Sequence, residues 1–148
     1  MKKLFGWTGK IARVNLTTGQ VDTIATADYA SRFIGGRGLA SRLYWETVAP
    51  ESGAFSPDTP LFFMTGPLAG TKAQAGSRWV VVGKSPLAFP EQYACANLGG
   101  RWGAALKWAG LDGLMIHGAA SRPVVLEIND SAHVSLTDAS GLWGRDVP

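Results

Sequence analysis

The chain has 148 residues, of which 46% are hydrophobic, and a formal net charge of +3. This length and composition predict a globular protein with one hydrophobic core and exclude a disordered chain. The basic residues are scattered, with no run longer than Lys2-Lys3, so we expect no nucleic-acid-binding surface.

Cys95 is the only cysteine. The chain by itself therefore forms no intrachain disulfide and ligates no iron–sulfur cluster, which fits a reducing compartment. The apolar residues near the N-terminus stop at Gly6, so neither a signal peptide nor a membrane span is predicted. We expect a cytoplasmic protein that does not associate with a membrane.

Alternating apolar and polar residues predict a hairpin, with strands over 11–16 and 21–24. Thr26 or Asp28 is expected to cap a helix that ends at Gly35-Gly36, and a second helix is expected from about Leu39 to Val48. Further strands are predicted over 61–65, 78–83, 93–96, 113–117, 124–129 and 133–137, with a helix over 100–109.

The segment 124–137 repeats the strand, turn and strand of the first hairpin, and Asp138-Ala139-Ser140 follows in the place of a helix cap. This similarity predicts an internal duplication. The second unit has no closing helix before Pro148, so we expect residues 1–148 to be a single domain truncated from a longer chain.

Residues 97–110 predict an extended segment that turns through Gly99-Gly100 into a short helix. Glycines let the backbone approach a ligand closely, and the first amides of a helix attract an anion. Arg78 begins a strand after the long loop 66–77, where its guanidinium can bind a phosphate bidentately. A solvated or salt-bridged arginine is the alternative, and both stay open.

Other chemical motifs are incomplete. Residues 66–72 have three residues between glycines where a phosphate loop has four, and Gly36-Arg37-Gly38 lacks a third glycine and follows a predicted helix. His117 and His133 lie on separate predicted strands without metal-ligand spacing, which favours structural histidines. Cys95 is more typical of a small buried hydrophobe than of a nucleophile.

Seven motifs stand in order along the chain: GWTGK (6–10), RVNLTTG (13–19), FIGGRGLA (33–40), TGPLAGT (65–71), KSPL (84–87), NLGG (97–100) and LKWAGLD (106–112). The ordered set resembles the N-terminal domain of the tungsten-containing aldehyde:ferredoxin oxidoreductase family. The resemblance runs from Gly6 to about Arg145. It implies an α+β fold of duplicated hairpin-plus-helix units, whose mostly antiparallel sheets form the base for a bis-molybdopterin cofactor of tungsten or molybdenum.

The resemblance also assigns roles to particular residues. Arg78 would contact the pterin and help to link it to an iron–sulfur cluster, and Asn97, Leu98, Gly99 and Gly100 would bind one pterin. The Asn97 backbone carbonyl would ligate the magnesium that bridges the two pterin phosphates. An anion-accepting turn, a guanidinium and hard oxygen donors are the groups that such a cofactor needs.

The resemblance further implies an enzyme that oxidises aldehydes to carboxylic acids and passes electrons to ferredoxin through a [4Fe–4S] cluster. The cysteines for that cluster would lie in later domains, so this chain alone is expected to be inactive. Ala73-Gln74 and Arg101-Trp102 differ from the residues expected there, which leaves open a related ring reductase acting on an aromatic thioester.

Two alternatives from other classes also stay open. One is a stand-alone module that binds a nucleotide or another small anion, and the other is a purely structural subunit. The sequence does not determine the substrate, the choice between tungsten and molybdenum, or whether the chain forms a homo-oligomer.

Overall fold

A computed structural model describes residues 5–146, so Lys2-Lys3 and Pro148 lie outside the described residues. Within this range the elements follow one another in the order β1 (Lys10–Asn15), β2 (Val21–Ala25), α1 (Ala27–Ala30), α2 (Gly36–Thr47), β3 (Leu61–Thr65), β4 (Trp79–Ser85), β5 (Gln92–Leu98), α3 (Trp102–Trp108), β6 (Gly113–His117), β7 (Val124–Asn129), a 3-10 turn (Asp130–Ala132) and β8 (His133–Asp138).

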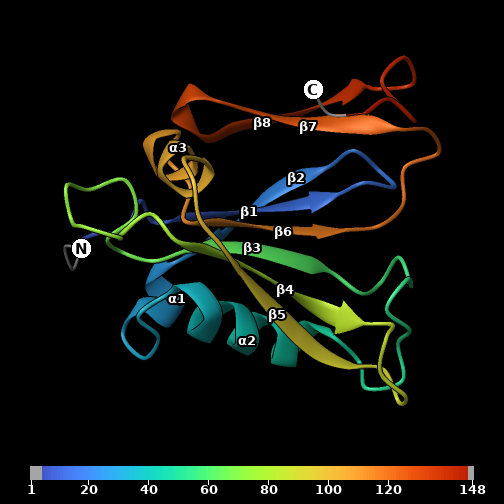
Figure 1. Ribbon diagram of the computed structural model, residues 1–148, viewed down its shortest axis with the longest axis horizontal. Helices are drawn as coiled ribbons and strands as arrows, with labels where there is room; N and C mark the ends of the chain where they lie inside the picture. The colour runs from blue at the N-terminus through green and yellow to red at the C-terminus, as the bar shows by residue number, and fades with distance from the viewer. Residues whose placement is uncertain (1–4, 147–148) are drawn as a thin grey trace.

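The main sheet has six strands in the order β2-β1-β6-β3-β4-β5, and β7 and β8 form a separate two-stranded sheet. Every neighbouring pair is antiparallel except β1 with β6, which is parallel. Figure 1 shows α1 and α2 below the main sheet, with α3 and the β7–β8 hairpin above it. This arrangement confirms the expected α+β class with mostly antiparallel sheets.

Two hydrophobic clusters lie on opposite faces of the main sheet, because successive side chains of a strand alternate between its faces. The face covered by α2, here called the α2 face, is built from Ile11, Leu39, Ala40, Leu43, Phe62, Met64, Val80, Val82 and Met115. The opposite face, the α3 face, is built from Ala12, Val14, Leu106, Leu111, Leu114 and Val134. Residues that are consecutive in β1 and β6 thus belong to different clusters.

Both hairpins of the expected duplication are present, but their surroundings differ. The β1–β2 hairpin is part of the main sheet, whereas β7 and β8 pair only with each other among the described residues. After β8 the chain forms turns, and the Ser140 backbone N–H donates to Oδ1 of Asp138 at 2.8 Å. The cap-like residues 138–140 therefore form a turn and do not begin a helix.

The prediction for the first helix was wrong in its extent. α1 has only four residues, and Thr26 is its N-cap residue but makes no side-chain capping hydrogen bond; its hydroxyl donates to Oδ2 of Asp112 at 2.6 Å. Gly35 and Gly36 have φ values of +117° and +52° and lead into α2, which begins at Gly36 and not at Leu39. A Cβ on Gly35 would lie 2.3 Å from Cη2 of Trp7, so tertiary packing requires glycine there.

Candidate functional site

Arg78 and the glycine turn meet at one end of the main sheet. β4 and β5 are antiparallel neighbours, with Trp79 opposite Leu98. The same register continued by one residue places Arg78 opposite Gly99. The predicted site residues, which are about twenty positions apart in the sequence, are therefore neighbours in the fold.

The turn lies at Gly99-Gly100 as predicted, but the helix after it begins two residues later than expected. Asn97 and Leu98 are the last residues of β5, and α3 begins at Trp102 and has only seven residues. The amides available to an anion are therefore those of the turn itself. Gly100 has φ +79°, which favours glycine, and a Cβ on Gly99 or Gly100 would meet nothing within 4 Å.

The candidate residues lie on an open edge. Arg78, Asn97, Gly99 and Gly100 are exposed, and Leu98 is half-buried. β5 is the last strand of the main sheet, so part of its backbone carbonyls and amides has no partner strand. Among residues 5–146 no carboxylate forms an ion pair with Arg78, so the salt-bridged alternative does not hold in the described structure.

A second guanidinium lies beside the same strand. Nη1 of Arg37, in the first turn of α2, is 4.0 Å from Sγ of Cys95, two residues before Asn97 in β5. The sequence analysis considered Arg37 only within an incomplete dinucleotide motif and assigned it no role. Its position depends on how α2 packs on the sheet, which local sequence does not reveal.

The principal cavities found among the described residues do not include the candidate residues in their walls. A cavity of about 240 Å³ lies between α3 and β7, where it is lined by Trp102, Leu106, Leu126 and Ile128 among others. A shallow hollow of about 220 Å³ lies on β3, β4 and β5, where Gly83, Ala94 and Ala96 leave little side-chain bulk. The candidate site is therefore an open surface at one end of β4 and β5 and not a cavity.

Three aromatic residues, Phe63, Trp79 and Trp102, form a cluster that contacts the glycine turn. The Trp79 indole Nε1 donates to the Gly99 carbonyl oxygen at 3.0 Å. The Trp79 ring stacks on Phe63 at a centroid distance of 6.2 Å and lies 4.2 Å from the ring of Trp102. Phe63 and Trp79 lie in strands that the sequence predicted, but no local pattern connected Trp79 with the turn.

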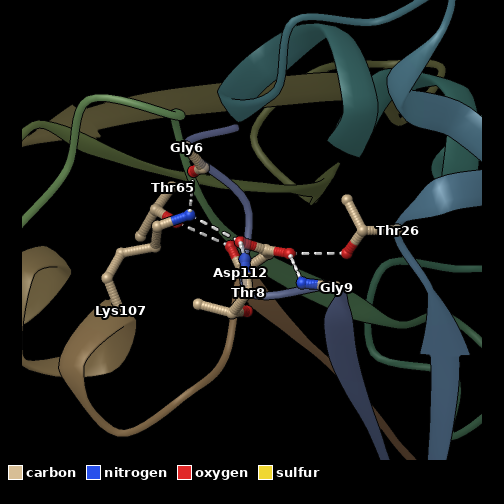
Figure 2. A network of polar contacts seen from close by, with 7 residues as sticks. All are labelled: Gly6, Thr8, Gly9, Thr26, Thr65, Lys107 and Asp112. Atoms are coloured by element: carbon tan, nitrogen blue, oxygen red, sulfur yellow. Dashed lines mark hydrogen bonds and ion pairs between the residues drawn. The ribbon is translucent and has the colours of Figure 1, made fainter. Parts of the chain in front are cut away.

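A buried ion pair holds several segments together at one side of the sheet (Figure 2). Nζ of Lys107 lies 2.5 Å from Oδ1 of Asp112, and their side chains are 7% and 0% exposed. The Asp112 carboxylate also accepts hydrogen bonds from the Thr8 and Gly9 amides and from the Thr26 hydroxyl. Four acceptor contacts compensate for burying this charge.

The same network reaches the loop that precedes Arg78. Lys107 Nζ donates to the Gly6 carbonyl at 2.7 Å, and the Asp112 carbonyl accepts from the Thr65 hydroxyl at 2.7 Å, where loop 66–77 begins. Trp108 Nε1 donates to the Gly70 carbonyl within that loop at 3.0 Å. Lys107 and Asp112 belong to a motif quoted above, but nothing local in the sequence indicated that they are buried together.

The remaining titratable residues do not form a second site in the described part of the chain. His117 lies in β6 and His133 in β8, in different sheets. No group of three or more His, Cys, Asp or Glu side chains within residues 5–146 is arranged to hold a metal ion. The described helices are all too short or too polar to cross a lipid bilayer.

The fold is an α+β domain with a glycine turn and two exposed guanidinium groups at an open sheet edge, and comparisons with known proteins identify its family. Residues 11–148 match the family model described as "Aldehyde ferredoxin oxidoreductase, N-terminal domain". The chain is 43% identical over 145 residues to the tungsten-containing aldehyde ferredoxin oxidoreductase of Pyrococcus abyssi, covering 97% of this chain and 23% of that protein.

More distant relatives have other activities. The chain is 32% identical over 145 residues to the WOR-like subunit of an aliphatic sulfonate oxidoreductase of Pyrococcus furiosus, covering 95% of this chain and 22% of that protein. In structure it is similar to the active site complex BamBC of benzoyl coenzyme A reductase in complex with 1,5-dienoyl-CoA, with a TM-score of 0.89, 35% identity, and coverage of 95% of this chain and 21% of that chain.

The chain therefore belongs to the aldehyde ferredoxin oxidoreductase family and corresponds to its N-terminal domain. It spans about a quarter of the length of the relatives that it matches. The resemblance inferred from the seven ordered motifs is confirmed.

Proposed function

We propose that residues 1–148 are a single cofactor-binding domain of an oxidoreductase that oxidises aldehydes to carboxylic acids and passes electrons to ferredoxin or a similar carrier. The names of the most similar relatives support tungsten and this reaction. The observation that carries the proposal is the pairing of Trp79 with Leu98 at the end of β4 and β5, because Arg78 directly precedes Trp79 and Gly99 directly follows Leu98. Cys95 as the only cysteine supports a reducing, cytoplasmic location.

The residues at this edge fit the phosphate groups of a bis-molybdopterin cofactor. The Arg78 guanidinium and the Gly99 and Gly100 amides offer donors to an anion, and no side chain fills the space next to the two glycines. The Asn97 carbonyl would supply a hard oxygen ligand for magnesium.

When bound, such a cofactor supplies the redox chemistry through its metal. The residues of this chain bind and orient it: Arg78 offsets the phosphate charge, the glycine turn donates backbone hydrogen bonds, and Leu98 continues the strand that positions the turn. Arg37 adds a second positive charge close to β5. A [4Fe–4S] cluster needs cysteines outside this chain, because Cys95 alone cannot ligate it.

A related ring reductase acting on an aromatic thioester is a second candidate. The structural similarity to the benzoyl coenzyme A reductase complex favours it, since the TM-score is 0.89 over 95% of the chain. The identity of 43% to a tungsten-containing aldehyde ferredoxin oxidoreductase favours aldehyde oxidation. Assays of the complete protein with aldehydes and with benzoyl-CoA separate the two substrates.

The cofactor site is tested by replacing Arg78 in the complete protein. Arg78→Ala should lower the tungsten or molybdenum content and the pterin content per polypeptide, because it removes a charged donor to phosphate. Arg78→Lys should retain part of both, since it keeps the charge but loses the bidentate geometry. Metal analysis and pterin fluorescence after cofactor release measure both quantities independently of activity.

Arg122→Ala is the matched control. Arg122 is also exposed, but it pairs with Asp138 of the second sheet at 3.0 Å. Its replacement should leave metal and pterin content unchanged. Unchanged metal content, pterin content and activity in Arg78→Ala would contradict the proposed site. Calorimetric binding of free nucleotides to a protein that contains no pterin would instead support the stand-alone anion-binding module.

A further inference from the structure

The Gly99–Gly100 peptide has two possible orientations with opposite electrostatic effects. If its N–H points outward, the turn donates to an anion; if its carbonyl points outward, the turn repels one. Two successive glycines restrict this choice very little, because they lack a Cβ and have access to most backbone conformations. Something outside the turn must select the orientation that an anion requires.

The Trp79 indole makes that selection in the described structure. Its Nε1 donates to the Gly99 carbonyl oxygen at 3.0 Å, which turns the carbonyl toward the aromatic cluster. Cis peptide bonds among the described residues occur only at Phe89-Pro90, so the Gly99–Gly100 bond is trans. In a trans peptide the C=O and the next N–H point in opposite directions. The Gly100 N–H therefore points away from Trp79.

The space on that outward side is open. Gly100 is exposed, and a Cβ placed on Gly99 or Gly100 would meet no atom within 4 Å. Among residues 5–146 the Gly100 N–H has no hydrogen-bond partner. The exposed Arg78 lies directly before Trp79, so the donor peptide and the guanidinium belong to the same end of the sheet.

The Trp79 ring has little freedom to release the carbonyl. It contacts Phe63, which stacks on it at an interplanar angle of 24°, and Trp102, whose ring centroid is 4.2 Å away, and these two rings also contact each other. A Cβ on Gly103 would lie 3.2 Å from Cδ1 of Trp79, so α3 also packs closely against the indole. Two segments of the fold, β3 and α3, therefore restrict the position of Nε1.

We propose that Trp79 is a positioning residue that holds the Gly99–Gly100 peptide with its N–H outward, so that the turn binds a phosphate group beside Arg78. The phosphate part of this inference rests on the proposed function. The orientation of the peptide does not, because the Trp79 to Gly99 hydrogen bond is present without any ligand.

The test uses the chain labelled with 15N-glycine and 15N-tryptophan, with inorganic phosphate as the probe. Trp79→Phe keeps an aromatic ring against Phe63 and Trp102 but removes the indole donor. The Gly100 amide resonance should shift or broaden before any phosphate is added. The apparent Kd for phosphate should rise about fivefold, the equivalent of one hydrogen bond with a net contribution of about 1 kcal/mol.

Trp143→Phe is the control, because it makes the same substitution at an exposed tryptophan in the turns after β8, away from the aromatic cluster at Trp79. It should leave the Gly100 resonance and the phosphate affinity close to those of the unmodified chain. A Gly100 resonance that is the same in Trp79→Phe and in the unmodified chain would overturn the positioning role.

Failure of the proposed function gives a different result. If phosphate does not perturb Gly100 in the unmodified chain but Trp79→Phe still does, the anion site is wrong and the orientation by Trp79 stands. If Trp79→Phe does not fold, the unmodified chain still tests whether the Trp79 indole donates a hydrogen bond to the turn. The Trp79 indole proton should exchange with solvent more slowly than that of its neighbour Trp102, and equal rates would contradict the hydrogen bond.

Discussion

Lys107 and Asp112 form a buried ion pair across the turn between α3 and β6, with Nζ 2.5 Å from Oδ1. The carboxylate binds the N-terminal segment through the Thr8 and Gly9 amides, each at 2.9 Å. The ammonium lies 5.2 Å from the centroid of the Trp7 ring and donates to the Gly6 carbonyl. One pair thus attaches the start of the described chain to the end of the main sheet.

Asp112→Asn should destabilise the protein strongly. The change keeps the shape of the side chain but leaves the Lys107 ammonium buried without its counter-charge, so we expect a loss of about 3–5 kcal/mol in the free energy of unfolding. Urea denaturation monitored by tryptophan fluorescence measures it. Asp22→Asn in the exposed Arg13–Asp22 pair is the control and should change stability by less than about 1 kcal/mol.

The double variant Asp112→Asn with Lys107→Met should recover part of this loss, because it removes the unpaired charge and keeps an unbranched side chain in its place. Full additivity of the two single effects would contradict a direct interaction between these side chains.

Gly100→Ala should destabilise the chain by about 1–2 kcal/mol, because φ at this position is +79° and a Cβ is strained in the left-handed region. Thermal unfolding followed by circular dichroism measures the effect. A Cβ on Gly99 also meets no atom within 4 Å, and φ at Gly99 is not in the left-handed region. The loss of stability in Gly99→Ala should therefore be smaller than in Gly100→Ala. Equal effects at the two positions would show that the turn relaxes around either substitution.

Gly113→Ala should disrupt the centre of the main sheet. β6 lies between β1 and β3, and a Cβ on Gly113 would lie 2.0 Å from the Met64 sulfur and 2.7 Å from the Phe63 carbonyl oxygen. Overpacking against backbone typically costs about 1–3 kcal/mol, and we expect a loss in this range by chemical denaturation. Gly66→Ala, where a Cβ meets nothing within 4 Å, should be nearly neutral.

Stability should fall in alkaline solution partly because of Tyr29. Partial burial raises the pKa of Tyr29 above its usual 10.0, and the hydrogen bond to Glu46 and the charge of Glu46 act in the same direction. The folded state therefore holds this proton more tightly than the unfolded state. The resulting stability is present below pH 10.0 and is lost as the pH rises through the folded pKa.

Tyr29→Phe should reduce the slope of unfolding free energy against pH in the range above about pH 10. A smaller slope remains, because burial also raises the pKa of Tyr44. Denaturation at a series of pH values measures the slope, and an identical slope in Tyr29→Phe and the unmodified protein would exclude a contribution from Tyr29.

Most strands were predictable from local pattern. The strands β3, β6 and β7 have the bounds expected from their apolar runs, and β1 places Ala12 and Val14 on one face as its alternation indicated. The first helix was predicted too long, since α1 ends at Ala30, and the Thr26 hydroxyl that was expected to cap it binds Asp112 instead. That competitor is 86 residues away in the sequence, beyond the reach of any local pattern.

The residues proposed to bind the cofactor were predictable from the sequence, but the residues that contact and position them were not. Arg78 and the glycine turn were recognisable from residue types and from family motifs, while Trp79, Arg37 and the Lys107–Asp112 pair were not. Their contacts depend on how β4 pairs with β5, how α2 lies on the sheet and how α3 closes against the N-terminal segment.

By itself the sequence determined the order of the strands and turns, the small net charge, the single cysteine and the family. These properties depend on composition and on residues a few positions apart, where alternation and glycine content govern the backbone directly. The tertiary structure alone decided that Trp79 pairs with Leu98 beside Arg78 and Gly99, that the Trp79 indole donates a hydrogen bond to the glycine turn, and that Lys107 and Asp112 form a buried ion pair. Such contacts form only when distant segments pack together, because strand register and burial are properties of the whole fold.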